Sequence, residues 1–228
     1  MSLQENIESV QERIAQYEAK AGVPENSVQL VAVSKTVDTQ TVREAYDLGL
    51  RMFGENRVQE FLRKSEELPK DIDWNLIGQL QTNKVKYIIN NKIALLHSLD
   101  RLSLAQELQT ECVKKDASIE TLVQVNIAKE DTKSGLYIED VEAFFEEIKD
   151  FDRIHVRGFM TIAPFTDDRV YLRKVFAAAK KLYDLWKPSF ERFDTLSMGM
   201  SGDYGEAILE GANMVRVGSA IFGARHYQ

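Results

Sequence analysis

The chain has 228 residues, of which 44% are hydrophobic and 29% are charged, and its formal net charge is −7. This length and composition favour a single globular domain over residues 1–228 with a well-buried core. The acidic balance excludes the broad basic surface of a nucleic-acid-binding protein. No apolar run reaches the roughly 18 residues that a membrane-spanning helix needs.

Helical and strand patterns alternate regularly along the chain. Helices are expected over residues 3–21, 39–48, 57–68, 81–90, 101–115, 137–150 and 167–187. Strands are expected over residues 28–35, 51–56, 73–79, 93–99, 120–127, 155–163, 194–199 and 214–223. This order predicts an α/β fold, a single (β/α)8 TIM-type barrel with an extra N-terminal helix. An open doubly wound sheet is the alternative, because the strand count does not prove closure.

The single cysteine and the N-terminal segment indicate a cellular compartment. Cys112 cannot form a disulfide within one chain, which favours a reducing environment, and we expect it on a surface helix. Residues 1–22 are charged and amphipathic, unlike the apolar segment of a secretion signal. We therefore predict a cytoplasmic protein.

Lys35 ends the first predicted strand, and the ends of strands are where barrel enzymes place their sites. Two-residue alternation puts it on the same face as Val31 and Val33. It is either a rim lysine whose charged end reaches water or a buried amine held neutral, as a Schiff base requires. The strand alone does not decide between these two roles.

Two loops of small residues follow the seventh and eighth predicted strands, which is the recurrent phosphate site of such barrels. The candidate cofactor contacts in these loops are Met200, Ser201, Gly218 and Ser219. Asp203 and Glu206 have capping-box spacing, which predicts a helix that begins just after Ser201. Backbone N–H groups and a hydroxyl at such a helix start can bind an anion. Glycines that only make tight turns are the alternative.

Arg216 lies between Val215 and Val217 in the eighth predicted strand. If the two valines pack on the outer helices, Arg216 points into the barrel and needs an acceptor there. It either forms a salt bridge to a carboxylate across the barrel or donates to the ring nitrogen of a cofactor. The three histidines show no metal-ligand spacing, so no metal site is predicted.

Seven blocks of sequence, in order along residues 28–225, resemble the YggS/PROSC family of pyridoxal-phosphate homeostasis proteins. The blocks are VAVSKTV, FGENRVQE, LIGQLQTNK, VNIAKEDTKSG, GFMTIAP, LSMGMSGDYGEAI and VRVGSAIFGAR. The resemblance implies a one-domain barrel similar to the N-terminal domain of bacterial alanine racemase, with pyridoxal 5′-phosphate as the cofactor.

The resemblance also implies roles for individual residues. It implies that Lys35 forms the Schiff base, that Arg216 faces the pyridine nitrogen and that Asn56 lies beside the ring. The phosphate contacts that it implies are Ser201, Gly218 and Ser219. Asn75 departs from the pattern, because the family commonly has a histidine there, and Lys133 matches a lysine of the family for which we expect an anion contact.

A guanidinium opposite the pyridine nitrogen can only donate, so the ring stays a weak electron sink. The alanine racemase route also needs an acid/base from a second domain, which we expect a chain ending at Gln228 to lack. We therefore predict a carrier that acts in intracellular pyridoxal phosphate homeostasis, with no catalytic residues and no robust activity. A pyridoxal-phosphate-dependent amino-acid racemase or lyase is one alternative, and a cofactor-free Schiff-base aldolase is another. The expected partners are pyridoxal phosphate and the apoenzymes that use it, not nucleic acid or a membrane, and the expected state is a monomer or weak homodimer.

Overall fold

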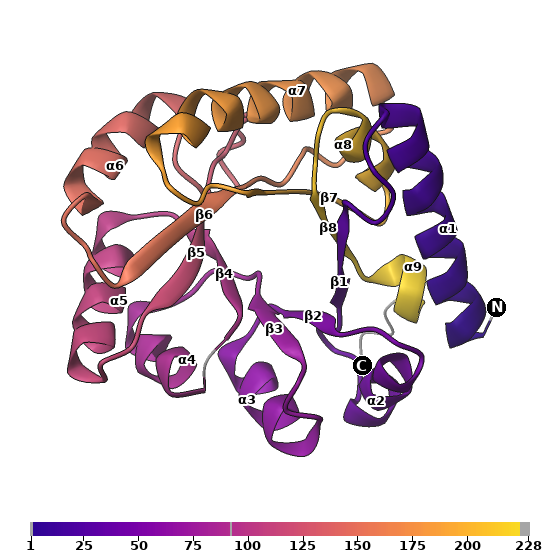
Figure 1. Cartoon of the computed structure of the whole chain (residues 1–228), viewed down its shortest axis with the longest axis horizontal. Helices are drawn as coiled ribbons and strands as arrows, with labels where there is room; N and C mark the ends of the chain where they lie inside the picture. Colours follow the sequence, from indigo (N-terminus) through magenta and orange to yellow (C-terminus); the bar gives the residue numbers. More distant parts are fainter. Residues whose placement is uncertain (1, 92, 224–228) are drawn as a thin grey trace.

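The computed structural model describes residues 2–91 and 93–223, and over these residues eight parallel strands close into one barrel (Figure 1). The strands are β1 (Gln29–Val33), β2 (Met52–Glu55), β3 (Asp73–Leu76), β4 (Leu95–Leu99), β5 (Ile119–Gln124), β6 (Ile154–Met160), β7 (Thr195–Met200) and β8 (Met214–Val217). Each strand pairs with the next, and β1 pairs with β8, where Val31 lies in register with Arg216. The closed barrel confirms the predicted fold and excludes the open sheet.

Helices surround the barrel on its outside (Figure 1). They are α1 (Leu3–Ala21), α2 (Thr39–Asp47), α3 (Val58–Glu67), α4 (Val85–Asn91), α5 (Leu102–Lys114), α6 (Val141–Ile148), α7 (Arg169–Trp186), α8 (Tyr204–Leu209) and α9 (Ser219–Phe222), with 3₁₀ turns η1 (Thr82–Lys84), η2 (Ile138–Asp140) and η3 (Lys187–Ser189). The last predicted strand is shorter than expected, because the chain leaves the barrel at Gly218 and begins α9. Among the helices of residues 2–91 and 93–223, none is long and apolar enough to cross a membrane.

Cys112 lies on α5, an outer helix as predicted, but its side chain is fully buried against the barrel. The prediction concerned the helix and missed the face of the helix on which the thiol lies. Burial raises the pKa of the Cys112 thiol to about 11, which keeps the thiol protonated at neutral pH.

Two apolar layers follow from the two-residue alternation of the strands. Val31 and Met214 belong to the cluster inside the barrel. Val215 and Val217 belong to the larger cluster between the strands and the helices. Arg216, which lies between the two valines, therefore points into the barrel, as the alternation predicts.

The N-terminal helix α1 lies against α8 and α9, the two short helices that follow β7 and β8 (Figure 1). The rings of Tyr17 and Tyr204 meet edge to face with their centroids 6.4 Å apart. Asn6 Nδ2 donates to the carbonyl oxygen of Ile221 at 2.9 Å. A Cβ at Gly205 would lie 2.2 Å from the Tyr17 ring, so this approach of the helices requires glycine. The extra helix thus fixes the backbone that follows strands seven and eight.

Candidate functional site

A cavity of about 570 Å³ opens at the carboxyl ends of the strands. The predicted contacts among its lining residues are Lys35, Met200, Ser201, Arg216, Gly218 and Ser219. Lys133 and the loop over residues 162–167 also line this cavity. Predicted contacts that lie up to 184 positions apart in the sequence (35 and 219) therefore meet at one end of the barrel.

Asn56, the seventh predicted contact, is not among the described residues that line this cavity. It follows β2 and is half-buried. A Cβ at Gly78 would lie 2.3 Å from the carbonyl oxygen of Asn56, so the chain after β3 packs directly on the chain after β2. The role of the Asn56 side chain beside a cofactor ring stays a prediction.

The backbone before Lys35 is held by the strands and by α3. Ser34 is fully buried, and its N–H donates to the carbonyl oxygen of Gly54 at 3.0 Å. Its hydroxyl donates to Glu55 Oε1 at 2.6 Å, and its carbonyl oxygen accepts from Lys64 Nζ at 2.7 Å. Every polar group of Ser34 therefore has a partner, which fixes the direction in which the chain leaves β1.

The backbone after Lys35 is held by the same helix. Thr36 has a φ of 63°, a left-handed conformation that is uncommon for a threonine. Its N–H donates to Glu60 Oε2 at 2.9 Å, and Glu60 is in turn 3.7 Å from Lys64 Nζ. A strained residue held by its surroundings is a feature of functional sites. α3 thus fixes the chain on both sides of Lys35.

Glu55 and Lys64 form a buried ion pair with 2.7 Å between Nζ and Oε1. Burial raises the pKa of Glu55, although Lys64 beside it acts in the opposite direction. The other carboxylate oxygen, Oε2, is buried and has no hydrogen-bond partner in the described part of the chain. Glu55 therefore supports the turn at Lys35 from outside the barrel.

The loop after β7 meets the loop after β8 at the hydroxyl of Ser201. Ser201 Oγ accepts from the N–H groups of Gly218 at 3.2 Å and Ala220 at 3.3 Å. Both N–H groups thus point at the Ser201 hydroxyl, whose own hydrogen can be donated to an anion at the edge of the cavity.

The helix predicted after Ser201 is present as α8, but the predicted capping box does not form. Asp203 makes no side-chain hydrogen bond to the helix N-terminus and instead accepts from the Met200 N–H at 2.6 Å. Burial raises the pKa of the Asp203 carboxyl, while its hydrogen bond to Met200 and the charge of Arg216 act against this. Asp203 thus closes the turn in front of α8 and contributes a carboxyl to the cavity wall.

Arg216 lines the cavity from inside the barrel, with 4% of its surface exposed. Its NH1 donates to Ser197 Oγ at 2.6 Å and its NH2 to the carbonyl oxygen of Thr161 at 2.9 Å. No carboxylate within residues 2–91 and 93–223 forms an ion pair with it, so the alternative of a salt bridge across the barrel is not observed. Burial lowers the pKa of Arg216 to about 10, which still leaves it cationic at neutral pH.

Several lining residues were missed or only partly foreseen from the sequence. Lys133 Nζ donates to the carbonyl oxygen of Ala163 at 2.7 Å and pairs with Glu130 at 2.5 Å, so it braces the loop after β6. Phe165 in that loop is fully exposed beside the cavity. Such loop residues carry no periodic signal, and only their position after a strand could have marked them.

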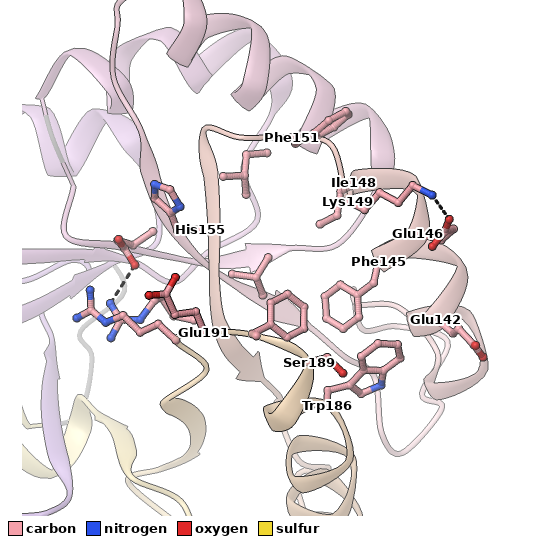
Figure 2. Close-up of a pocket in the computed structure, with 16 residues that line it drawn as sticks. Glu142, Phe145, Glu146, Ile148, Lys149, Phe151, His155, Trp186, Ser189 and Glu191 are labelled. Carbon is pink, nitrogen blue, oxygen red and sulfur yellow. Dashed lines mark hydrogen bonds and ion pairs between the residues drawn. The ribbon is translucent and has the colours of Figure 1, made fainter.

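A larger cavity of about 1000 Å³ lies at the other end of the barrel, near the start of β6 (Figure 2). The Phe145 ring meets Trp186 at 4.6 Å and Phe190 at 5.0 Å between centroids. Within its wall Arg157 pairs with Glu120, and Figure 2 shows Lys149 bonded to Glu146. Arg157 also pairs with Asp194, which lies outside the lining. None of the predicted contacts is among its described lining residues.

The donors at the carboxyl end of the barrel fit pyridoxal phosphate group by group. Lys35 carries an amine that would react with the aldehyde, the loops at Ser201 and Gly218 carry donors that would suit the phosphate, and Arg216 carries a donor that would suit the ring nitrogen. A metal is not suggested by the geometry, since the described residues hold no cluster of three or more His, Cys, Asp or Glu side chains.

Comparison with known sequences agrees with this chemistry. The chain matches the family model of the alanine racemase N-terminal domain over residues 3–226. It is 42% identical over 229 residues to the pyridoxal phosphate homeostasis protein of Aquifex aeolicus, with 100% of each chain covered. It is 40% identical over 227 residues to the protein of the same name from Pseudomonas aeruginosa, covering 99% of this chain and 97% of the relative.

Comparison with solved structures gives the same fold. PipY of Synechococcus elongatus with pyridoxal phosphate bound has a TM-score of 0.83 and 33% identity, covering 97% of this chain and 100% of that chain. An alanine racemase from Clostridium difficile has a TM-score of 0.75 at 15% identity, covering 96% of this chain and 60% of that chain, which concerns the fold alone. The relatives and the family model together show that this chain belongs to the pyridoxal phosphate homeostasis protein family, which has the alanine racemase N-terminal fold.

Proposed function

We propose that this chain binds pyridoxal phosphate as a Schiff base on Lys35 and acts in the homeostasis of that cofactor in the cytoplasm. The observation that carries the proposal is that an amine, two loops of small residues and a guanidinium face one cavity of about 570 Å³. Relatives at 42% and 40% identity bear the corresponding name, and PipY at 33% identity has been solved with pyridoxal phosphate bound.

The proposal gives each part of the cavity wall a task. Ser201 and the backbone N–H groups of Gly218 and Ser219 hold the phosphate. Arg216 donates to the ring nitrogen and excludes a proton from it. We assign Met200 of the wall to the ring. Asn56, which is not among the described lining residues, is assigned to the ring on the family resemblance alone.

Arg216 decides the kind of function that we propose. The cofactor, when bound, supplies an aldehyde and an electron-withdrawing ring, and its withdrawal is strongest when the ring nitrogen is protonated. The guanidinium of Arg216 has no lone pair, so it cannot accept a hydrogen bond from a protonated ring nitrogen. With a pKa of about 10, Arg216 remains a cationic donor at neutral pH. A site of this kind favours holding and releasing the cofactor over sustained turnover.

The central claim is tested by borohydride reduction of the cofactor-loaded protein, followed by intact mass and peptide mapping. We expect a mass gain of one pyridoxyl phosphate located on Lys35 and absent from Lys35→Ala. Lys181→Ala, which removes an exposed lysine of α7, should retain the label. A label spread over several lysines, or none at all, would contradict the proposal and would favour the cofactor-free aldolase.

The carrier is distinguished from an amino-acid racemase or lyase by incubation of the loaded protein with a panel of L-amino acids. Chirality and keto-acid release are then followed over many equivalents. We expect rates no greater than those of free pyridoxal phosphate. Sustained turnover above that level would favour the enzyme.

The proposal also covers the domain organisation, the oligomeric state and the partners of the protein. We propose that residues 1–228 act as one cofactor-binding domain, as a monomer or weak homodimer. Apoenzymes that use pyridoxal phosphate are the proposed recipients. The exposed Phe165 and Met200 at the mouth of the cavity support a site from which a recipient can take the cofactor.

A further inference from the structure

A line of polar side chains crosses the inside of the barrel and ends at Arg216. Asn75 of β3, His97 of β4 and Ser197 of β7 are buried to 1% exposure or less. Asn75 Oδ1 lies 2.9 Å from His97 Nε2, and His97 Nδ1 lies 3.2 Å from Ser197 Oγ. Ser197 Oγ lies 2.6 Å from NH1 of Arg216. Of these four described residues, Arg216 is the one that lines the cavity.

The direction of every hydrogen bond in this line follows from its first member. Asn75 Nδ2 donates to the carbonyl oxygen of Asp73 at 3.0 Å, so its Oδ1, an acceptor only, faces His97. His97 must then carry its proton on Nε2 and accept at Nδ1. Ser197 donates its hydroxyl hydrogen to Nδ1, and its oxygen accepts from Arg216. Asn75, His97 and Ser197 each donate once and accept once, and Arg216 donates at the end of the line.

The line has a single charge, on Arg216. The hydrogen-bond partners of His97 on β3 and β7 are neutral, and the charged group that acts on His97 is Arg216. Burial and that charge hold the pKa of His97 well below its ordinary range. A proton on Nδ1 would also remove the acceptor of the Ser197 hydroxyl. The Ser197 hydroxyl hydrogen would then turn away from His97. The Ser197 oxygen would face a second donor, the Nδ1–H of His97, in addition to NH1 of Arg216.

We propose that Asn75 and His97 are positioning residues that fix the guanidinium of Arg216 through Ser197, by holding His97 as the neutral Nε2–H tautomer. The guanidinium is thereby pinned on two sides, at Ser197 and at the carbonyl oxygen of Thr161. Its remaining N–H groups are left in one orientation toward the cavity. The part of the proposal that concerns the cofactor rests on the proposed function, whereas the part that concerns the tautomer does not.

The tautomer is tested in the cofactor-free protein by long-range ¹H–¹⁵N correlation of the histidine side chains. The chain has three histidines, so His155→Gln and His226→Gln assign the remaining signals to His97. We expect the Nε2–H pattern in the wild type and no titration of His97 between about pH 5 and 8. An Nδ1–H pattern, or an imidazolium in this range, would overturn the proposal, and neither assignment variant changes a residue of the line.

The role of Asn75 is tested with Asn75→Asp. A carboxylate at this position accepts from Nε2–H and stabilises the imidazolium, so His97 should begin to titrate between about pH 5 and 8. Asn83→Asp adds the same charge at an exposed position of η1 and should leave the His97 signals unchanged. Unchanged His97 signals in Asn75→Asp would show that Asn75 does not set the tautomer.

The link to the cofactor is tested by the rate at which loaded protein releases pyridoxal phosphate. Asn75→Leu removes the acceptor of Nε2–H, and release should become ~10-fold faster because the guanidinium loses its fixed orientation. Asn83→Leu is the control and should release at the wild-type rate. If Asn75→Leu alters the tautomer but not the release rate, Arg216 is not positioned in this way. A wild type that takes no pyridoxyl label on Lys35 would instead refute the proposed function and leave the tautomer result standing.

Discussion

Lys64 Nζ lies 2.7 Å from Glu55 Oε1 and donates at the same distance to the carbonyl oxygen of Ser34, the residue before Lys35. Lys64 and Glu55 are both fully buried, on α3 and at the end of β2. The ion pair is therefore part of the support of the site, because it fixes the backbone from which Lys35 extends. Burying an ion pair costs solvation, which hydrogen bonds such as these must offset.

Lys64→Met should destabilise the fold strongly. The change leaves the Glu55 carboxylate buried without its cation, which costs about 3–5 kcal/mol in comparable buried pairs. Urea unfolding at neutral pH measures the loss, and the borohydride label on Lys35 should decrease as well. Lys114→Met is the control, since Lys114 is 61% exposed and its partner Glu111 keeps a second cation, Lys115. Equal effects of the two substitutions would mean that the buried pair is not a support of the site.

The position of Glu55 shows one limit of the sequence argument. As a polar residue at the end of a strand, it has a sequence position typical of the barrel rim. It shares its face with Phe53, which belongs to the outer core, so two-residue alternation sends it outward to α3. The signal was present, but the partner was not predictable, because Lys64 is held in place by the packing of α3 on the barrel.

His97 should make the stability of the fold depend on pH. Its folded pKa lies well below the ordinary value of 6.5, because of burial and then the charge of Arg216. The unfolded chain therefore takes up a proton near that value while the folded chain does not. As the pH falls below 6.5, the unfolding free energy should decrease by up to about 1.4 kcal/mol per pH unit from this group.

Urea unfolding at about pH 7 and about pH 5.5 measures this dependence. His97→Gln should flatten it, whereas His155→Gln, which removes an exposed histidine, should leave it in place. Carboxylates that titrate at lower pH contribute equally to both variants. A slope that survives in His97→Gln would assign it to other groups.

The sequence predicted the barrel and the inward direction of Arg216, but not the line of residues that ends there. Asn75 alternates with Trp74 and Leu76 of the outer core, so its inward direction could be predicted from β3 alone. The meeting of His97 with Ser197 could not. They lie 100 positions apart on strands that are not neighbours, and only the closure of the barrel brings them together.

Gly199→Ala should destabilise the end of β7. Gly199 has a φ of 93°, and a Cβ there would lie 2.7 Å from Ala207 Cβ and 2.8 Å from Tyr204 Cα. We expect a loss of about 1–3 kcal/mol, because the strained backbone and the clash with α8 act together. Gly202→Ala is the matched control, since a Cβ at Gly202 meets nothing within 4 Å. Comparable losses of unfolding free energy for both variants, measured by urea unfolding, would mean that strain and the clash with α8 do not explain the glycine at position 199.

Ser201→Ala should weaken the binding of pyridoxal phosphate about 10-fold, the usual effect of losing one hydrogen bond to a charged group. The hydroxyl is the point at which the N–H groups of Gly218 and Ala220 converge, so its loss removes one donor from the phosphate and leaves the two N–H groups in place. Pyridoxal, which has the aldehyde but no phosphate, is the decisive probe, because it can react with Lys35 without using this loop.

Titration of both compounds into wild type and Ser201→Ala separates the two roles of the hydroxyl. A loss of affinity confined to pyridoxal phosphate assigns Ser201 to the phosphate. The control is Ser189→Ala, at an exposed position of η3, which should bind both compounds as the wild type does. An equal loss for pyridoxal would mean that Ser201 acts by joining the loops after β7 and β8. The phosphate would then be held by backbone N–H groups alone, because Arg216 and Lys35 are committed to the other end of the cofactor.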